Sequence, residues 1–388
     1  MKNILVISFN FPPIAKVSGL RASKFTKYLP EFGYNPLILT VDPRYYAKTI
    51  FDNLETSQNR PNIFRIPFLP LPAARTIIAL LFPFFILFYV FKYRKILDAI
   101  YLVGSPYHPF AITPILTKLL RIPVLLDFRD SWSMNYGYDG RSKNDVKLFT
   151  KLKHKLYFII EKIALNFTSA ASFSTPKLLE EYIDCHPKNS PKYHTVLNGY
   201  DEDDFKGIQP ISLSSKKTIV VAGKFTIYIG NFLKEILLAI KSIPNLTLIY
   251  VGSEHAIIEK AVNQLNMADR SIIKSYQPYQ TLLKIVSGSD FGLLSTGLVN
   301  GLGTKIFDYM ALKKPFLCLV PKGSIITDFF GDIEGVVISE YPHTREKVEN
   351  GLKKLLKYKS FENESETSKY TRRNSTQKLS QILDSIIK

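Results

Sequence analysis

Apolar runs alternate with amphipathic stretches along most of this chain. The first run, ILVISF within residues 3–9, precedes a proline-containing loop with Gly19 and a segment in which Phe25, Tyr28 and Phe32 recur on one helical face. Such a run followed by helical spacing is typical of a strand buried in a parallel sheet and of the helix that covers it. The alternation continues through the runs PLILT, DAIYLVG, IPVLLDF, ASFS and HTVL. The first part of the chain is therefore predicted to be a parallel α/β domain.

A turn-rich, acidic stretch, NGYDEDDF at residues 198–205, interrupts this alternation. The pattern then resumes with KTIVVAGKF, LTLIYVG, SIIKSY, DFGLL, PFLCLV and GVVIS, and it closes on the amphipathic segment LSQILDSIIK. Because domain boundaries fall in polar, turn-rich segments, we place the junction in this stretch. The predicted fold class is α/β, with one domain over 1–200, a second over 201–365 and a terminal helix over 366–388.

One segment is more apolar than a surface helix requires. Residues 77–91, IIALLFPFFILFYVF, lie between Arg75 and the basic segment 92–95. A membrane-spanning helix needs about 20 apolar residues, and Pro83 falls in the middle of this shorter run, which argues against a span. Two interpretations remain: a helix lying in a membrane surface with its basic flanks on anionic headgroups, or a buried crossover helix of the first sheet.

Charge and cysteine content narrow the partners and the compartment. The chain has 51 Lys and Arg against 33 Asp and Glu, a formal net charge of +18, which favours a phosphorylated substrate, an anionic lipid or nucleic acid. The basic residues form no aromatic-interleaved recognition motif, which disfavours nucleic acid. The two cysteines, Cys185 and Cys318, support neither a disulfide framework nor a multi-cysteine zinc site. The N-terminus lacks a small-residue cleavage site, so we expect a cytosolic protein.

The strongest local signal is NGLGTKIFDYMALKKP, residues 300–315, which lies between two predicted strands. Gly301 and Gly303 permit close approach of a ligand, and a helix beginning near Thr304 would direct unpaired N–H groups at an anion such as diphosphate. Lys305 in the first turn opposes the helix dipole unless an anion sits there, and Asp308 is a candidate acceptor for ribose hydroxyls. An ordinary capped helix with solvated charges fits the same spacing.

Three further segments carry candidate chemistry at predicted strand ends. AGKF places Lys224 at the carboxyl end of the first strand of the second domain, where open α/β sheets bind ligands. LLDFRDSW places Arg129 at a similar edge of the first domain, and SPYHPF places His108 there as a proton shuttle or sugar contact. The simpler interpretations are a solvated lysine, an ion pair of Arg129 with Asp130 and an incidental loop histidine.

The ordered set of these motifs resembles the retaining glycosyltransferases of family four, which have the two-domain architecture called GT-B. The resemblance spans nearly the whole chain, from FNFPPIAKVSGLRASKFTKYLPEFGYNPLILT through DFRDSW, VLNGYDEDDF and VVAGKF to GLGTKIFDYMALKKP. It implies two Rossmann-like domains facing across a cleft, with the acceptor on the first, a nucleotide sugar on the second and a terminal helix crossing back to the first. It also implies a role in surface polysaccharide biosynthesis, on a lipid-linked or saccharide acceptor, at the inner face of the membrane.

The same resemblance assigns roles to individual residues. It places Gly19, Asn300, Gly301, Gly303, Thr304 and Asp308 at the donor, and Lys224, Lys305, Arg129 and His108 at the reacting groups. Lys224 and Lys305 would neutralise the leaving diphosphate, so that neither a metal nor another cofactor is expected.

This chain departs from the family pattern at several motif positions. The family's two acidic donor residues are Asn300 and Asp308 here, and its basic pair is Lys224 and Ile229. Its first-loop glycine pair corresponds to residues 15–16, Ala and Lys, and a frequent histidine corresponds to Arg129.

Two other functions fit the same architecture. One is a sugar-nucleotide epimerase, which would convert the donor without an acceptor, although the apolar segment argues against it. The other is a non-catalytic sugar-nucleotide-binding protein, which the replacement of a family carboxylate by Asn300 favours. The sequence lacks the Walker GxxxxGK[ST], HExxH, CxxC and GxSxG motifs, so the commonest NTPase, metalloprotease and hydrolase interpretations have no support.

Overall fold

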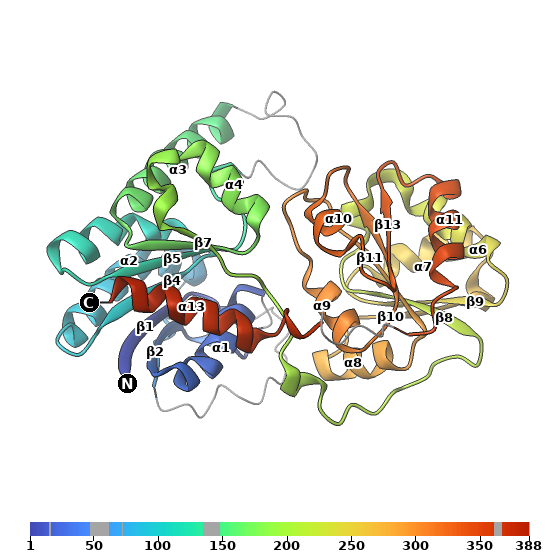
Figure 1. Ribbon diagram of the computed structural model, residues 1–388, viewed down its shortest axis with the longest axis horizontal. Coiled ribbons are helices and arrows are strands. Elements are labelled where there is room, and N and C mark those ends of the chain that lie inside the picture. Colours follow the sequence, from blue (N-terminus) through green and yellow to red (C-terminus); the bar gives the residue numbers. More distant parts are fainter. Residues whose placement is uncertain (15–16, 47–61, 72, 135–147, 361–366, 388) are drawn as a thin grey trace. The chain divides into compact units, whose positions relative to one another are not determined.

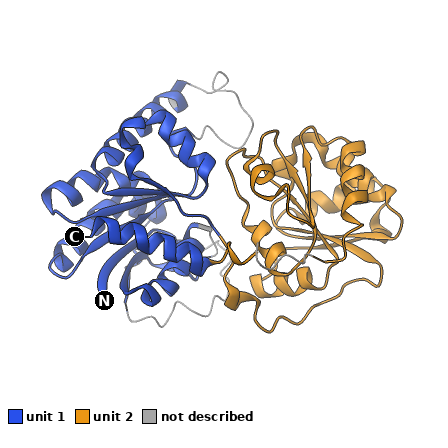
Figure 2. Cartoon of the chain, viewed as in Figure 1, with its two compact units in different colours: residues 1–198, 372–388 blue, residues 199–371 orange. Residues whose placement is uncertain are grey.

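The computed structural model describes residues 1–14, 17–46, 62–71, 73–134, 148–360 and 367–387. The chain divides into two compact units (Figure 2). Unit 1 comprises Met1–Asn198 and Arg372–Lys388, and unit 2 comprises Gly199–Thr371. Each unit is built on its own parallel sheet with helices packed against it (Figure 1). The predicted α/β class is therefore confirmed.

Unit 1 contains a seven-stranded parallel sheet in the order β3-β2-β1-β4-β5-β6-β7. Its central strands are apolar at nearly every position because helices cover both faces. The strand order reverses between β1 and β4, so the loops after these two strands flank a topological switch point. The strands are β1 (Lys2–Ser8), β2 (Tyr34–Val41), β3 (Ile63–Ile66), β4 (Ala99–Val103), β5 (Val124–Phe128), β6 (Ala170–Phe173) and β7 (Tyr193–Thr195).

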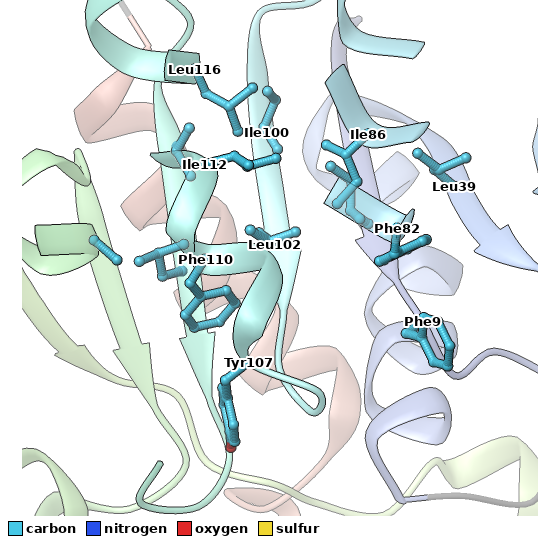
Figure 3. Close-up of a cluster of buried hydrophobic side chains, with 14 of the residues drawn as sticks. Phe9, Leu39, Phe82, Ile86, Ile100, Leu102, Tyr107, Phe110, Ile112 and Leu116 are labelled. Atoms are coloured by element: carbon cyan, nitrogen blue, oxygen red, sulfur yellow. The ribbon is translucent and has the colours of Figure 1, made fainter. Parts of the chain in front are cut away.

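An apolar layer lies on each face of the unit 1 sheet. On one face, Phe82 and Ile86 of α2 and Ile112 and Leu116 of the segment after β4 are directed into one buried cluster (Figure 3). On the other face, α1 and the C-terminal helix α13 pack together, and Leu383 of α13 is fully buried. The helices are α1 (Val17–Tyr28), α2 (Ala74–Tyr93), α3 (Leu148–Phe167), α4 (Pro176–Cys185) and α13 (Arg372–Ile386).

A buried polar network connects α1 to the sheet of unit 1. Arg21 of α1 and Asp127 of β5 form an ion pair in which both side chains are fully buried, with Nε and Oδ2 2.8 Å apart. Burial alone would lower the pKa of Arg21, but the adjacent Asp127 carboxylate raises it above its ordinary value. The amide oxygen of Asn198 accepts from Arg21 and from Arg372, the first residue of α13. The last residue before the chain leaves unit 1, Asn198, therefore accepts a buried hydrogen bond from the first residue after its return, Arg372.

Unit 2 contains a six-stranded parallel sheet in the order β10-β9-β8-β11-β12-β13, which is the doubly wound Rossmann order with its switch point between β8 and β11. The strands are β8 (Lys217–Ala222), β9 (Leu246–Val251), β10 (Ser271–Lys274), β11 (Phe291–Ser295), β12 (Phe316–Val320) and β13 (Val336–Glu340). The helices are α5 (Thr226–Ile229), α6 (Leu233–Ser242), α7 (His255–Gln264), α8 (Tyr279–Ser287), α9 (Thr304–Ala311), α10 (Ile325–Phe330) and α11 (Arg345–Leu355).

The apolar segment of residues 77–91 forms most of α2, and the structure corrects one premise about it. The helix runs over 20 residues with Pro83 inside it, so it is long and apolar enough to cross a membrane by length and composition. What opposes a span is packing: Ile78, Phe82 and Ile86 are at most 1% exposed and belong to the core of unit 1. The inner face of α2 therefore agrees with the interpretation of a buried crossover helix. Its outer face is not buried, since Phe84 there is 68% exposed.

Candidate functional site

The loops after β8 and β11 lie side by side at the carboxyl edge of the unit 2 sheet. Ser295, at the end of β11, donates a hydrogen bond to the carbonyl oxygen of Phe225 at 3.1 Å. Between β8 and Phe225 the chain turns at Gly223, whose φ of +87° favours glycine, and exposed Lys224 follows directly. The structure thus brings the predicted AGKF loop and the predicted glycine-containing loop to one switch point.

A buried carboxylate that the sequence analysis did not identify holds the AGKF loop. Glu254, at the start of α7, accepts hydrogen bonds from the backbone N–H groups of Phe225 at 2.6 Å and Thr226 at 2.9 Å. It also accepts from the Thr226 hydroxyl at 3.0 Å. These two N–H groups are therefore satisfied within the protein. The Lys224 side chain of the same loop is exposed to solvent.

The N-terminus of α9 has the form of an anion site. Gly303 occupies the N-cap position with no side-chain cap, so the first N–H groups of the helix are not covered by a capping side chain. Gly301, Gly303, Thr304 and Lys305 are partly exposed, whereas the following turn is buried. Asn300 lies in the turn before the helix and is half-buried. The predicted loop therefore precedes a helix N-terminus without a side-chain cap, and its binding of diphosphate stays a prediction.

Asp308 is more enclosed than the sequence analysis implied. Its side chain is 8% exposed, and both carboxylate oxygens already accept hydrogen bonds. The hydroxyl of Tyr279, the first residue of α8, donates to Oδ1 at 2.7 Å, and the Lys305 ammonium lies 3.0 Å from Oδ2. Lys305 also lies over the Tyr279 ring, with its nitrogen 5.1 Å from the ring centroid. A ribose hydroxyl can therefore bind Asp308 only by displacing or joining one of these two donors.

Tyr279 is a second component of this candidate site, after Glu254, that the sequence analysis did not identify. It lies 29 positions from Asp308 along the chain, between the apolar runs SIIKSY and DFGLL. No spacing rule links the two positions, because their contact depends on how α8 and α9 pack over the sheet. The QPYQ turn before α8 was the available signal, since aromatic residues at strand ends often line ligand sites.

In unit 1, Arg129 and Asp130 follow β5 and form the predicted ion pair with each other. Arg129 Nε lies 2.9 Å from Asp130 Oδ2, and both side chains are largely buried. The backbone N–H of Asp130 donates to the Tyr107 hydroxyl at 2.9 Å, and that hydroxyl donates to the Asp130 carbonyl oxygen at 2.9 Å. The guanidinium of Arg129 is thus held beside the loop that follows β4.

His108 and Gly19 have structural contacts that their predicted roles did not include. The Nε2 of His108 hydrogen-bonds the carbonyl oxygen of Ala79 in α2, and burial lowers the pKa of the ring below its ordinary value. A side chain at Gly19 would meet the Asn10 carbonyl oxygen at 2.9 Å, so this glycine lets α1 approach the loop after β1. Residues 15–16, the counterpart of the family's glycine pair, lie outside the described part of the chain.

Within the described residues, no group of three or more His, Cys, Asp and Glu side chains is arranged to hold a metal ion.

Neither the family models nor the curated proteins yield a match to the sequence. Solved structures do match, over essentially the whole chain. A glycosyltransferase from Rickettsia africae ESF-5 has a TM-score of 0.70 at 14% identity and covers 100% of this chain and 99% of its own. Sucrose-phosphate synthase from Thermosynechococcus elongatus has a TM-score of 0.67 at 14% identity, with coverages of 100% and 95%.

A third similar structure contains a nucleotide. The Anabaena protein HepE, determined in complex with UDP and glucose, has a TM-score of 0.63 at 13% identity, with coverages of 100% and 97%. At these identities the likeness establishes the fold and no more. The chain has the GT-B fold, with two Rossmann-like α/β units, that the sequence analysis predicted.

Proposed function

We propose that this chain is a glycosyltransferase that transfers a sugar from a nucleotide diphosphate sugar to a lipid-linked or saccharide acceptor. The observation that carries the proposal is the helix α9, whose N-terminus has no side-chain cap and carries Lys305 in its first turn, at the switch point of a Rossmann sheet. Proteins with the same fold support the nucleotide as ligand: HepE was determined with UDP-glucose, and an E. coli protein with UDP-2-fluoro-glucose.

In this proposal the diphosphate lies against the first N–H groups of α9, between Lys305 and the exposed Lys224. Charge develops on the diphosphate as the bond from the anomeric carbon to its oxygen breaks, and fixed cations stabilise that charge without reorganising. The incoming phosphate draws Lys305 from Asp308, which releases one carboxylate oxygen for a ribose hydroxyl. Two lysines and a helix terminus supply positive charge where a metal ion would otherwise be needed.

The acceptor side of the proposal rests on unit 1. Arg129 lies at the carboxyl edge of that sheet and suits a phosphate of a lipid-linked acceptor, while His108 and Gly19 border the switch point there. We further propose that the reaction retains anomeric configuration and serves surface polysaccharide assembly at the inner face of a membrane. NMR of the first-formed product tests retention directly, because an inverted anomer would contradict it.

The test of the donor site is a titration of UDP and UDP-sugars into the full-length protein by calorimetry. Lys305→Gln removes a charge-assisted contact, so we expect roughly a 10- to 100-fold loss of affinity for UDP. Asp308→Asn should also weaken UDP binding, but it should leave pyrophosphate binding unchanged or tighter, because Lys305 is then freed from its partner. Lys260→Gln, at an exposed position of α7, is the matched control and should bind as wild type.

Turnover distinguishes the functions that share this fold. Incubation with membrane extract and each UDP-sugar, followed by mass spectrometry, should give UDP release that depends on acceptor. Conversion of the donor without acceptor would indicate an epimerase, and binding without turnover would indicate a sugar-nucleotide-binding protein, as Asn300 in place of a carboxylate would favour. Unchanged binding and turnover in both site variants would refute the proposed site.

A further inference from the structure

Three consecutive elements cover one face of the unit 1 sheet and expose an apolar surface to solvent. The elements are α2, the segment 115–121 and α3. His108, in the short helix that precedes the segment 115–121, hydrogen-bonds Ala79 of α2. Lys118 lies over the Phe167 ring of α3 with its nitrogen 5.9 Å from the centroid. All three contribute buried or partly buried side chains to a single core cluster. The outer sides of these elements therefore belong to one side of unit 1.

Both helices expose large apolar residues at the same helical spacing. On α2 the exposed positions follow the spacing i, i+4, i+8 and i+11, with side chains 60–68% exposed, and α3 repeats that spacing and extends it by one residue. Between them, Leu119 is 74% exposed. The set is Leu80, Phe84, Phe88 and Phe91 on α2, and Leu148, Leu152, Leu156, Ile159 and Ile163 on α3. Two helical rows of large exposed apolar residues mark an interaction site rather than ordinary surface, on which such residues are scattered singly.

The exposed charges on these three elements are of one sign. The exposed charged residues of the three elements are all Lys or Arg, including Lys118, Lys151 and Lys155. The one acidic residue in these elements, Glu161, is fully buried, where it accepts hydrogen bonds from Ser133 and Tyr182. An apolar surface whose own exposed charges are all basic matches a bilayer with anionic headgroups. A second copy of the same surface would bring like charges together, which disfavours a symmetric dimer.

The outer side of α2 also offers space for an apolar chain. Pro67 and five α2 residues line a hollow of about 540 Å³, and Phe84 and Phe88 form part of its wall. We infer that α2, the segment 115–121 and α3 form a docking surface for an anionic lipid bilayer, with both helices lying in its plane. The inner face of α2 stays in the core, so the helix docks on the bilayer and does not cross it. This inference does not depend on the glycosyltransferase proposal.

The test is sedimentation of the full-length protein with vesicles of phosphatidylcholine, with and without phosphatidylglycerol. We expect binding that requires the anionic lipid and weakens with salt. Lys151→Gln with Lys155→Gln should lose about fivefold in affinity per lysine. Leu152→Gln should lose about tenfold, because an exposed leucine would otherwise enter the acyl region. The controls Lys260→Gln and Ile257→Gln change exposed residues of unit 2 and should bind as wild type.

Emission from an added tryptophan reports where the surface lies. Leu152→Trp should shift to the blue on addition of anionic vesicles, while Ile257→Trp should not. Circular dichroism confirms that each variant is folded. The inference is overturned if the protein does not bind the vesicles or if the variants bind as wild type. It is also overturned by a dimer that Phe84→Gln dissociates. Resistance of the expressed protein to carbonate extraction would overturn it too, because it would mean that α2 spans the membrane.

Discussion

The buried ion pair of Arg21 and Asp127 should dominate the stability of unit 1. The Asp127 carboxylate accepts four hydrogen bonds: from Arg21 Nε at 2.8 Å, Arg21 Nη2 at 2.9 Å, Tyr101 at 2.9 Å and Ser172 at 2.7 Å. Asp127→Asn keeps the shape but replaces one acceptor oxygen by an NH₂ group. Two of the four groups that donate to Asp127 would then face this NH₂ group, which is itself a donor. The charge of Arg21 would have no buried counter-charge.

The structure sets the size of the effect. Removing one partner of a fully buried pair costs about 3–5 kcal/mol, because it strands the other charge. That is a large part of the roughly 5–15 kcal/mol that separates folded from unfolded domains. By contrast, Asp42→Asn disturbs the pair of Asp42 with Arg44, whose side chain is 67% exposed, and should cost less than about 1 kcal/mol. The two substitutions are chemically identical and differ in burial.

The chain provides its own reporter for this measurement. Trp132 is its single tryptophan, lies in unit 1 and is buried at 8% exposure, with its ring stacked on Tyr107. Urea unfolding followed by tryptophan fluorescence therefore reports unit 1 specifically. A cost below about 1 kcal/mol for Asp127→Asn, or equal costs for the two variants, would refute the reasoning. A combined Arg21→Leu and Asp127→Leu variant should cost less than the sum of the single ones.

Two further predictions concern stability. Leu383→Ala should destabilise unit 1 by about 2–5 kcal/mol in the Trp132 assay, because Leu383 of α13 is fully buried against the sheet. The control Lys378→Ala changes an exposed residue of the same helix and should alter the stability little. Equal effects of the two substitutions would mean that α13 is not docked in solution. His343 is 2% exposed, and burial, followed by the nearby Lys347, lowers its pKa from 6.5 to about 4. A depressed folded-state pKa means that stability is complete above pH 6.5 and is lost as the pH falls towards 4, by about 2 kcal/mol after solvent screening. His343→Phe should remove this pH dependence in urea unfolding followed by circular dichroism, and an unchanged dependence would assign it to other groups.

Much of the fold follows from local pattern. The strands of both sheets are continuous apolar runs because they are covered on both faces, and such runs can be identified without tertiary information. The segment between the apolar runs IPVLLDF and ASFS supplies α3, Leu148–Phe167, whose apolar residues recur at helical spacing. The outward leucines of that helix were visible in the sequence, but the pattern does not show which helical face meets the sheet. Only the burial of Glu161 and the exposure of Leu152 reveal the second apolar face.

The site was predictable where it depends on backbone geometry and hidden where it depends on tertiary packing. A glycine-containing loop before a helix implies an uncapped N-terminus, so the region around Thr304 could be identified from residue types. Glu254 could not, because it reaches Phe225 and Thr226 from a separate βα unit. The length of α2 was underestimated because the sequence analysis took the apolar run of residues 77–91 as the whole helix. Arg75 and Lys92 lie inside the helical turns that extend it to Ala74–Tyr93.

The ion pair of Lys305 and Asp308 explains how a lysine is tolerated at a helix N-terminus. The dipole disfavours a cation in the first turn by about 0.3–1 kcal/mol, and a carboxylate one turn later, held by Tyr279, offsets this cost. Asp308 is buried, so the pair is shielded from solvent more than a surface pair would be. A diphosphate carries more negative charge than one carboxylate and also meets the helix N–H groups. It can therefore compete with Asp308 for Lys305, as the proposed function requires.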